Sequence, residues 1–397
     1  MFDKKSDFQR VRTSHNDEKG SRSGAYSWIF CILKMLVKVL IVVLIAFVVN
    51  WAFKTMLMFD VNKRVYNHRP GECRRVKGPE HGSEDITVVE DKQLAFISSG
   101  LAWLQEPEAV TYDGKMYLYD MSRRNYEAKE LKVIGLEDED NFHPHGLSHY
   151  ILKDGTIRLF VVSHSKQFKH SIILMDYIDN ELRVVKTVKN DKFVRPNDIV
   201  ATGENSFLLS NDGGAQTAMW NAFEALTGLY KGGVVYFDGI KARYLLENHV
   251  GNGISLSRDS KTLFVSHINQ ESIGVFKWDQ KKIKLEKISE VNTLTGCDNF
   301  YVDEKDQLWS GCHPVLKDVL GHFGNHSDDS LYGPSQVLLF KFSKDYKEAD
   351  MVEVFADDGR FISASAIAVG FDNQKQLLIG SVSRELVHCD ISTTLNF

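Results

Sequence analysis

The stretch EDITVVEDKQLAFISS, residues 84–99, joins an acidic pair to an apolar run, a turn containing Asp and Lys, and a second apolar run that ends in serine. Short apolar runs on both sides of such a turn predict two antiparallel β-strands. The pattern occurs five more times, with starts 46 to 67 residues apart. These copies are HGLSHYILKDGTIRLFVVSH (145–164), NDIVATGENSFLLSND (197–212), NGISLSRDSKTLFVSH (252–267), DNFYVDEKDQLWSGCH (298–313) and SAIAVGFDNQKQLLIGSV (365–382). Six repeats of this period predict an all-β, six-bladed β-propeller with one blade per copy.

An apolar segment, Trp28–Phe53, precedes the repeats. Lys34 and Lys38 lie on its N-terminal flank, where long side chains reach the lipid headgroups, so the segment predicts a single transmembrane helix. More basic residues precede the span than follow it, which favours a cytoplasmic N-terminus. The expected domains are a cytoplasmic tail without stable structure (1–27), a transmembrane signal-anchor in contact with lipid (28–57) and the propeller on the lumenal or extracellular side (58–397).

A cleaved signal peptide is the alternative interpretation of the apolar segment. Against it, the polar lead of 27 residues is long, and no small-x-small cleavage site follows the apolar run. An uncleaved anchor places the protein in the endoplasmic reticulum, the plasma membrane, or both. The net charge of −5 provides no basic surface for nucleic acid.

Two cysteines flank the repeats, Cys73 before the first and Cys389 after the last. A disulfide between them would close the ring and, by restricting the unfolded chain, contribute on the order of 5 kcal/mol. Two unrelated thiols are the alternative. Asn325 begins an Asn-His-Ser glycosylation sequon, a tripeptide that also arises by chance.

Polar residues recur at the start of the repeats. They are Glu84 and Asp85, His145, Asn197 and Asp198, Asn252, and Asp298 and Asn299. In a propeller these equivalent positions converge at the central tunnel. Turn chemistry explains two or three of them, since Asp and Asn bond their own backbone at strand starts. Four carboxylates on one axis would repel one another, which favours a calcium ion held by carboxylate and amide oxygens.

Residues 213–230, GGAQTAMWNAFEALTGLY, form the one clear helical pattern, with Met219, Phe223, Leu226 and Tyr230 on one face. The helix either packs on the propeller or presents an apolar surface to a membrane or a partner.

The sequence resembles the paraoxonase/arylesterase family from about residue 70 to the C-terminus. The resemblance rests on GSEDI (82–86), LAFISSG (94–100), PHGLS (144–148), PNDIVATG (196–203), NGISLS (252–257), WSGCHP (309–314) and LLIGSV (377–382). It implies a six-bladed propeller with two Ca²⁺ ions in its tunnel. The implied ligands are Glu84, Asn197, Asn252, Asp298 and Asn299 for the catalytic ion, and Asp85, Asp198 and the backbone carbonyl of Leu147 for the structural ion.

The resemblance also implies chemistry. His145 would deprotonate a water with help from His164, and calcium would polarise the carbonyl of a lactone or ester. The alternative is that His145 only caps the tunnel and has no catalytic role. Cys73 and Cys389 match the disulfide of the family, and Cys312 matches its free thiol. In the family the helix at 213–230 covers the active site and contacts lipid.

Three positions depart from the family: Val250 and Ser383 replace pocket aromatics, and Gly213 replaces a histidine. The uncleaved anchor resembles the nematode membrane-anchored branch, whose members are accessory factors of degenerin/epithelial sodium channels. Three functions follow as hypotheses: an accessory or chaperone-like factor for channel subunits, a calcium-dependent lactonase or arylesterase, and an adhesion or scaffold propeller.

Overall fold

The chain divides into a helical unit, Met1–Met56, and a unit built of β-sheets, Leu57–Phe397. The computed structural model describes residues 19–101, 111–138, 141–324, 328 and 330–395. The predicted glycosylation site, Asn325, lies outside the described residues.

The N-terminal helix α1 (Lys19–Met58) contains 40 residues. Its segment Ser27–Met58 is long and apolar enough to cross a membrane, and no other helix of the described chain is. Membrane anchors and signal sequences both have this property. These bounds agree with the predicted span, 28–57. The tail was predicted to lack structure up to residue 27, but the helix already begins at Lys19.

The β unit contains four separate four-stranded antiparallel sheets. The first is β10 (Pro196–Gly203), β11 (Ser206–Asn211), β12 (Gly233–Phe237) and β13 (Ala242–Glu247); the second is β14 (Ile254–Leu256), β15 (Thr262–His267), β16 (Ser272–Asp279) and β17 (Lys284–Asn292). The third is β18 (Gly296–Val302), β19 (Leu308–His313), β20 (Ser335–Phe342) and β21 (Ala349–Asp357); the fourth is β22 (Ser365–Phe371), β23 (Gln376–Ser381), β24 (Leu386–Asp390) and β1 (Cys73–Arg75).

The remaining eight strands form one continuous sheet. In spatial order it runs β2 (Ile86–Val89), β3 (Leu94–Ser99), β4 (Lys115–Asp120), β5 (Lys129–Ile134), β9 (Glu181–Val188), β8 (His170–Ile178), β7 (Ile157–His164) and β6 (His143–Ile151). The all-β propeller-like fold is therefore confirmed, but the prediction of six separate blades is corrected: only four are separate sheets, and the other eight strands form a single sheet. The physical reason is a short parallel pairing of the outer strands β5 and β9, from Lys132↔Glu181 to Ile134↔Arg183, which joins eight strands into one sheet.

The hydrophobic core is divided among the interfaces between neighbouring sheets. One cluster joins Leu208 and Val234 of one sheet to Ile254, Leu263 and Phe276 of the next. Burying each such side chain contributes about 1.5–3 kcal/mol. The strands that supply them are rich in β-branched and aromatic residues, which fit a pleated, buried surface.

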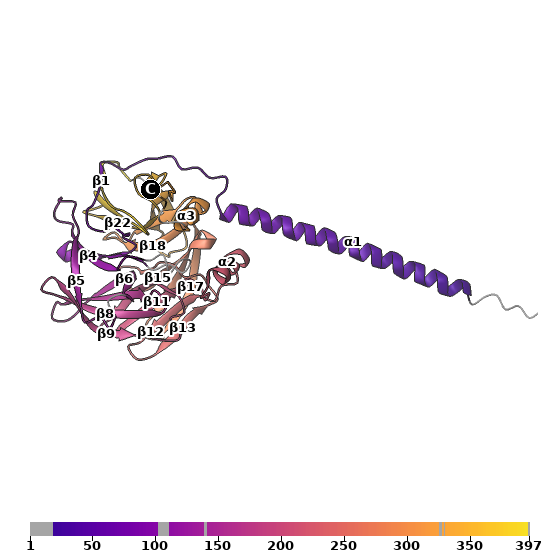
Figure 1. The fold of residues 1–397 in the computed structure, drawn as a ribbon, viewed down its shortest axis with the longest axis horizontal. Coiled ribbons are helices and arrows are strands. Elements are labelled where there is room, and N and C mark those ends of the chain that lie inside the picture. The colour runs from indigo at the N-terminus through magenta and orange to yellow at the C-terminus, as the bar shows by residue number, and fades with distance from the viewer. Residues whose placement is uncertain (1–18, 102–110, 139–140, 325–327, 329, 396–397) are drawn as a thin grey trace, which may run out of the picture. The chain divides into compact units, whose positions relative to one another are not determined.

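The two ends of the β unit meet in one sheet. The N-terminal strand β1 pairs with β24 near the C-terminus, so that indigo and yellow strands lie side by side (Figure 1). Cys73 lies opposite Cys389 in this pairing, and the two form a disulfide with a Cα–Cα distance of 4.0 Å, as the sequence predicted.

Replacing Cys73 or Cys389 by serine should lower the free energy of unfolding by roughly 2–5 kcal/mol, the usual loss for a native disulfide. Because each change removes the same bond, the double variant should be no less stable than either single variant. Urea unfolding of the three variants measures this. Additive losses would show that the disulfide does not hold the two strands together.

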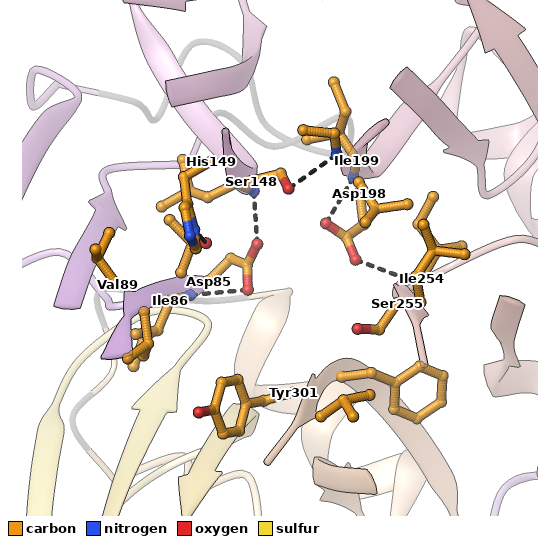
Figure 2. A pocket seen from close by; sticks show the side chains of 18 of the residues that line it. Asp85, Ile86, Val89, Ser148, His149, Asp198, Ile199, Ile254, Ser255 and Tyr301 are labelled. Atoms are coloured by element: carbon orange, nitrogen blue, oxygen red, sulfur yellow. Dashed lines mark hydrogen bonds between the residues drawn. The ribbon is translucent and has the colours of Figure 1, made fainter. Parts of the chain in front are cut away.

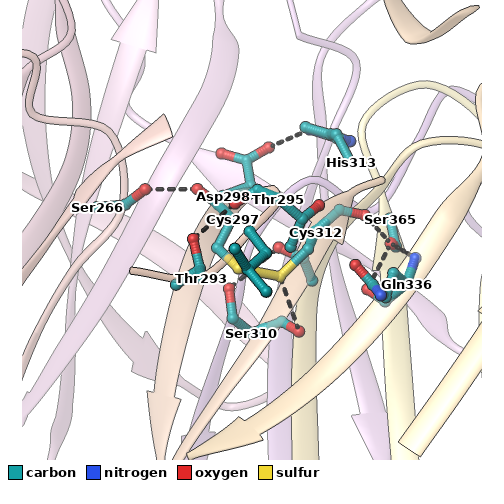
Figure 3. The surroundings of a disulfide bond; sticks show 12 residues. Ser266, Thr293, Thr295, Cys297, Asp298, Ser310, Cys312, His313, Gln336 and Ser365 are labelled. Carbon is teal, nitrogen blue, oxygen red and sulfur yellow. Dashed lines mark hydrogen bonds and ion pairs between the residues drawn. A yellow bond between two sulfur atoms is a disulfide. The ribbon is translucent and has the colours of Figure 1, made fainter. Parts of the chain in front are cut away.

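A second disulfide corrects the prediction that Cys312 is a free thiol. Cys297 of β18 lies directly opposite Cys312 of β19, with a Cα–Cα distance of 3.9 Å, and the two are bonded (Figure 3). Both side chains are buried and belong to an apolar cluster with Phe264 and Leu338. The resemblance pointed to a free thiol, whereas a cysteine at position 297 faces Cys312 across the strand pair.

The predicted helix at 213–230 is present but shorter. Helix α2 (Ala218–Thr227) begins where the Thr217 side chain accepts a hydrogen bond from the Trp220 N–H, and it ends at Gly228, whose φ of +70° suits glycine. Of the predicted apolar face, Met219, Phe223 and Leu226 are exposed. Tyr230, the fourth residue of that face, is buried, so the stripe packs at one end and is exposed at the other.

Candidate functional site

The polar residues of the repeats occupy bulges in three strands. In β10 the register changes between Pro196 and Ile199, so two residues oppose one residue of β11. The same change occurs in β18 and in β6. A bulge frees two consecutive side chains from the ordinary alternation of a strand. Adjacent residues such as Asn197 and Asp198 can then both turn toward the interior.

Residues from two of these bulges and residues that precede the inner strands β2 and β14 share one cavity of about 200 Å³. Glu84, Asn197, Asn252 and Asp298 line it, as predicted for residues that would share a cation. Asn299 is buried beside them, and its Nδ2 donates to Oε1 of Glu84 at 2.8 Å. All five predicted ligands of the catalytic ion therefore lie together.

Three of these side chains have an oxygen without a hydrogen-bond partner although it is buried: Glu84 Oε2, Asn197 Oδ1 and Asn299 Oδ1. Buried polar atoms are normally paired, and leaving each unpaired costs about 1–3 kcal/mol. Carboxylate and amide oxygens are the ligands that calcium prefers. The donor set therefore fits a calcium ion. Among the described residues, no cluster of three or more His, Cys, Asp or Glu side chains could hold a metal ion by itself. The predicted calcium ligands do not form such a cluster, because three of the five are asparagines.

The predicted ligands of the structural ion line a second cavity, of about 430 Å³. Asp85 and Asp198 project into it (Figure 2). Oδ1 of Asp85 accepts from the N–H of Ile86 at 2.8 Å and Oδ2 from the N–H of Leu147 at 2.5 Å. Asp198 accepts from the N–H of Ile254 in the same way, at 2.7 Å. Each carboxylate thus ties its own inner strand to the next one.

Burial makes these carboxylates difficult to ionise. Burial, with the charge of Glu84, raises the pKa of Asp85 to about 7. Burial and the charge of Asp85 raise the pKa of Asp198 well above its usual range. The pKa of Asp298 is also raised by burial, although a hydrogen bond to His313 opposes the shift. A cation would remove this penalty, because opposite charge favours the ionised form.

Calcium affinity should therefore fall as the pH falls below about 7. Below its raised pKa Asp85 carries a proton that calcium must displace, so the Kd for calcium should rise about tenfold per pH unit for each proton released. Calcium titrations at pH 6, 7 and 8 measure how steeply the Kd changes with pH. The variant Asp85→Asn has no proton to release at this position, so its Kd should change less steeply. A Kd independent of pH over this range would contradict the assignment.

The histidines His145 and His164 line the cavity beside the oxygen set, as does His313. Nδ1 of His145 lies 2.9 Å from Nε2 of His164, and Nε2 of His145 lies 3.4 Å from Oε1 of Glu84. Burial alone would lower the pKa of His145, but the charge of Glu84 and its hydrogen bond raise it. Burial and the neighbouring histidines lower the pKa of His164 well below its usual range. His164 is therefore the neutral partner of the pair.

Sequence reasoning missed a third histidine and the partner of Asp298. Nδ1 of His164 lies 2.7 Å from Nδ1 of His170, which extends the pair toward another cavity. Nε2 of His313 lies 3.1 Å from Oδ2 of Asp298. His313 was present in the quoted motif WSGCHP, but His170 follows no repeat position and carries no signal in the sequence.

The positions that depart from the family have local explanations. At Gly213 a Cβ atom would lie 2.6 Å from Oε2 of Glu224 and 2.8 Å from Nη2 of Arg195, so a side chain there would require these two groups to shift. Val250 is buried and Ser383 bonds to His322; neither lines the cavity. Its apolar lining comes from other residues, namely Leu101, Phe168, Ile268, Leu316, Leu320, Phe323 and Val382.

The fold and this site define a propeller-like protein with a small, partly apolar cavity and convergent polar groups, the usual form of a small-molecule site. Residues 65–391 match the arylesterase protein family, and the chain belongs to that family. The family predicted from the sequence is thus confirmed.

Relatives in the family cover most of the chain. Serum paraoxonase/arylesterase 2 of Gallus gallus is 30% identical, over 80% of this chain and 88% of its own. Mechanosensory abnormality protein 6 of Caenorhabditis elegans is 26% identical, over 87% of this chain and 93% of its own. Among solved structures, the calcium-binding protein regucalcin of Agrobacterium tumefaciens shares the fold, with a TM-score of 0.50, 12% identity and coverage of 82% and 96%.

Proposed function

We propose that this protein is a calcium-dependent hydrolase of lactones or aryl esters. The observation that carries the proposal is the location of the His145–His164 pair in the same cavity as Glu84, Asn197 and Asp298. A general base beside a set of cation ligands is the arrangement that ester hydrolysis needs. Membership of the arylesterase family supports it.

One set of tautomers fits both these hydrogen bonds and the role of His145 as a general base. If Nδ1 of His145 donates to Nε2 of His164, then Nδ1 of His164 carries its one proton and donates to His170. Nε2 of His145 is then the basic nitrogen. It lies 3.4 Å from Oε1 of Glu84, so it accepts a proton from a water molecule only when calcium, rather than this ring, holds that carboxylate. His164 holds the ring of His145 in this orientation.

Two calcium ions are proposed, one at each set of ligands, and the name of the regucalcin structure as a calcium-binding protein agrees with this. When bound, calcium polarises the substrate carbonyl and stabilises the negative charge that develops on its oxygen. Glu84 and Asp298 supply the ionised oxygens of that site, and Asn197, Asn252 and Asn299 supply neutral ones. The cavity of about 200 Å³ suits a small ester or lactone better than a large one.

The proposal is tested with the full chain purified in detergent. Initial rates on phenyl acetate and on δ-valerolactone should exceed the uncatalysed rates and saturate with substrate. A folded, calcium-loaded protein that accelerates neither reaction would refute the proposed activity.

We propose as a second function the accessory role for channel subunits that the resemblance to the nematode membrane-anchored branch implies; the chain aligns with 93% of Mechanosensory abnormality protein 6 of Caenorhabditis elegans. In this proposal α1 is an uncleaved anchor, with the N-terminus cytoplasmic and the propeller in the lumen of the endoplasmic reticulum or at the cell surface. A protease-accessible N-terminal tag on sealed microsomes, with a glycosidase-sensitive mass shift from Asn325, supports this topology; a protected tag refutes it.

A further inference from the structure

The segment that directly follows α1 is anchored in the β unit. Asp60 is only 1% exposed, although it carries a carboxylate. A buried carboxylate requires partners, because it is costly to desolvate. Its partners belong to two elements that are far away in the sequence.

The first element is helix α3 (Leu316–Phe323). Oδ2 of Asp60 accepts a hydrogen bond from the N–H of Leu316 at 3.0 Å, and the carbonyl of Phe59 accepts one from the N–H of Lys317 at 3.2 Å. The residue that precedes the helix, Val315, provides no side-chain cap. Asp60 therefore caps α3 from a distance, and its negative charge is favourable at the N-terminal end of a helix.

The second element is the short helix η4 (Ile268–Gln270). Nζ of Lys63 lies 2.5 Å from Oδ1 of Asp60 and 2.9 Å from Oε1 of Glu271, the residue that ends η4. The same ammonium donates to the carbonyl of Leu294 at 2.5 Å. Lys63 thus connects the cap of α3 to the end of η4.

Both elements form part of the cavity that contains His145. Leu316, Leu320 and Phe323 of α3 and Ile268 and Asn269 of η4 line it. They supply much of its apolar surface, whereas the predicted calcium ligands and the histidines lie on or beside the inner strands.

The two ends of α3 are held differently. At the C-terminal end His322 bonds to Oγ of Ser383 at 2.6 Å and to the carbonyl of Leu331 at 2.9 Å. At the N-terminal end the first two N–H groups of the helix bond to Asp60 and Phe59. The position of Leu316, and of the apolar wall that begins there, therefore depends on the segment that leads in from α1.

We propose that Asp60 and Lys63 are positioning residues that set how tightly the cavity binds its substrate. They do so by fixing α3 and η4, the two apolar walls, without touching the calcium ligands or the histidines. The inference rests on the proposed function for its substrate. It predicts that a change in this segment alters KM and leaves kcat nearly unchanged.

The test uses the full chain in detergent micelles with phenyl acetate as the probe. Asp60→Ala should raise KM about five- to tenfold, the factor that corresponds to the loss of one helix cap, with kcat changed less than about twofold. Asp60→Asn keeps an oxygen for the Leu316 N–H and should restore most of the affinity, since asparagine also caps helices well. Asp318→Ala is the matched control, because Asp318 is half exposed on the same helix and, among the described residues, its ion pair is with its neighbour Lys317.

Hydrogen exchange provides a readout that does not depend on activity. In Asp60→Ala the amides of Leu316 and Lys317 should exchange about fivefold faster, and in Asp318→Ala they should not. If Asp60→Ala does not fold, Lys63→Met tests the same connection through Glu271. Unchanged exchange, or a fall in kcat at constant KM, would overturn the proposal. If the wild type hydrolyses no phenyl acetate, the proposed function fails, and exchange alone decides the role of Asp60.

Discussion

Replacing Asp298 by alanine is expected to weaken calcium binding by more than about 100-fold. Changes in groups that only orient metal ligands typically cost 10- to 100-fold, and Asp298 would supply one of the ionised oxygens itself. Without it the site keeps the oxygens of Glu84 and the three asparagines but loses one of its two predicted carboxylate ligands.

The same change should remove much of the stability that calcium supplies. A ligand present at 1,000 times its Kd stabilises the folded state by about 4 kcal/mol, and a 100-fold weaker site retains only about 1.4 kcal/mol at the same concentration. Calorimetric titration and thermal unfolding with calcium or with chelator measure both effects.

Asp303→Asn is the matched control. Asp303 is as deeply buried as Asp298 and follows the same strand, but it bonds to Trp309 and Lys305 outside the cavity. The variant Asp303→Asn should lower the free energy of unfolding and leave calcium affinity unchanged. If Asp298→Ala bound calcium and melted like the wild type, the calcium site would be wrongly placed.

His145→Gln is expected to lower kcat for phenyl acetate by more than about 100-fold, since general-base catalysis contributes about 10²- to 10⁴-fold. Glutamine has no basic nitrogen to take the proton from water, but it replaces no calcium oxygen. Calcium affinity and unfolding should therefore stay near the wild-type values. Kinetics and calcium titration on the same preparation separate the two.

His149→Gln is the control for that change. His149 lies on the same strand, β6, but it bonds to Oγ1 of Thr87 and lines the cavity of Asp85 and Asp198. It should leave kcat unchanged. A His145→Gln variant that loses hydrolysis but still supports channel subunits would favour the accessory function, and a variant that loses both would tie that function to catalysis.

The repeat pattern was sufficient to predict which residues converge. Glu84, Asn197, Asn252 and Asp298 follow one another at intervals of 46 to 113 residues in the sequence, and their common place at the start of inner strands predicted that they meet. What the pattern does not contain is the bulge that turns two neighbours inward at once. That feature depends on the register between two strands and has no signature in either strand alone.

Three features could not be predicted for similar reasons. The pairing of β5 with β9 covers three residues on each outer strand, too few to leave a pattern. Helix α3 has eight residues and contains Gly321, so it is too short for helical periodicity and depends on tertiary contacts. Asp60 and Leu316, whose N–H it caps, are 256 residues apart in the sequence, and only the fold brings them together.

The central claim, that calcium in this cavity supports hydrolysis by His145, is tested most directly by the initial rate as a function of free calcium. Full-length protein is stripped with chelator and then titrated with calcium in the presence of phenyl acetate or δ-valerolactone. The rate is predicted to fall to background after chelation and to recover along the same curve as calcium binding. Hydrolysis that persists without calcium, or calcium that binds and stabilises the fold while no hydrolysis appears, would contradict it.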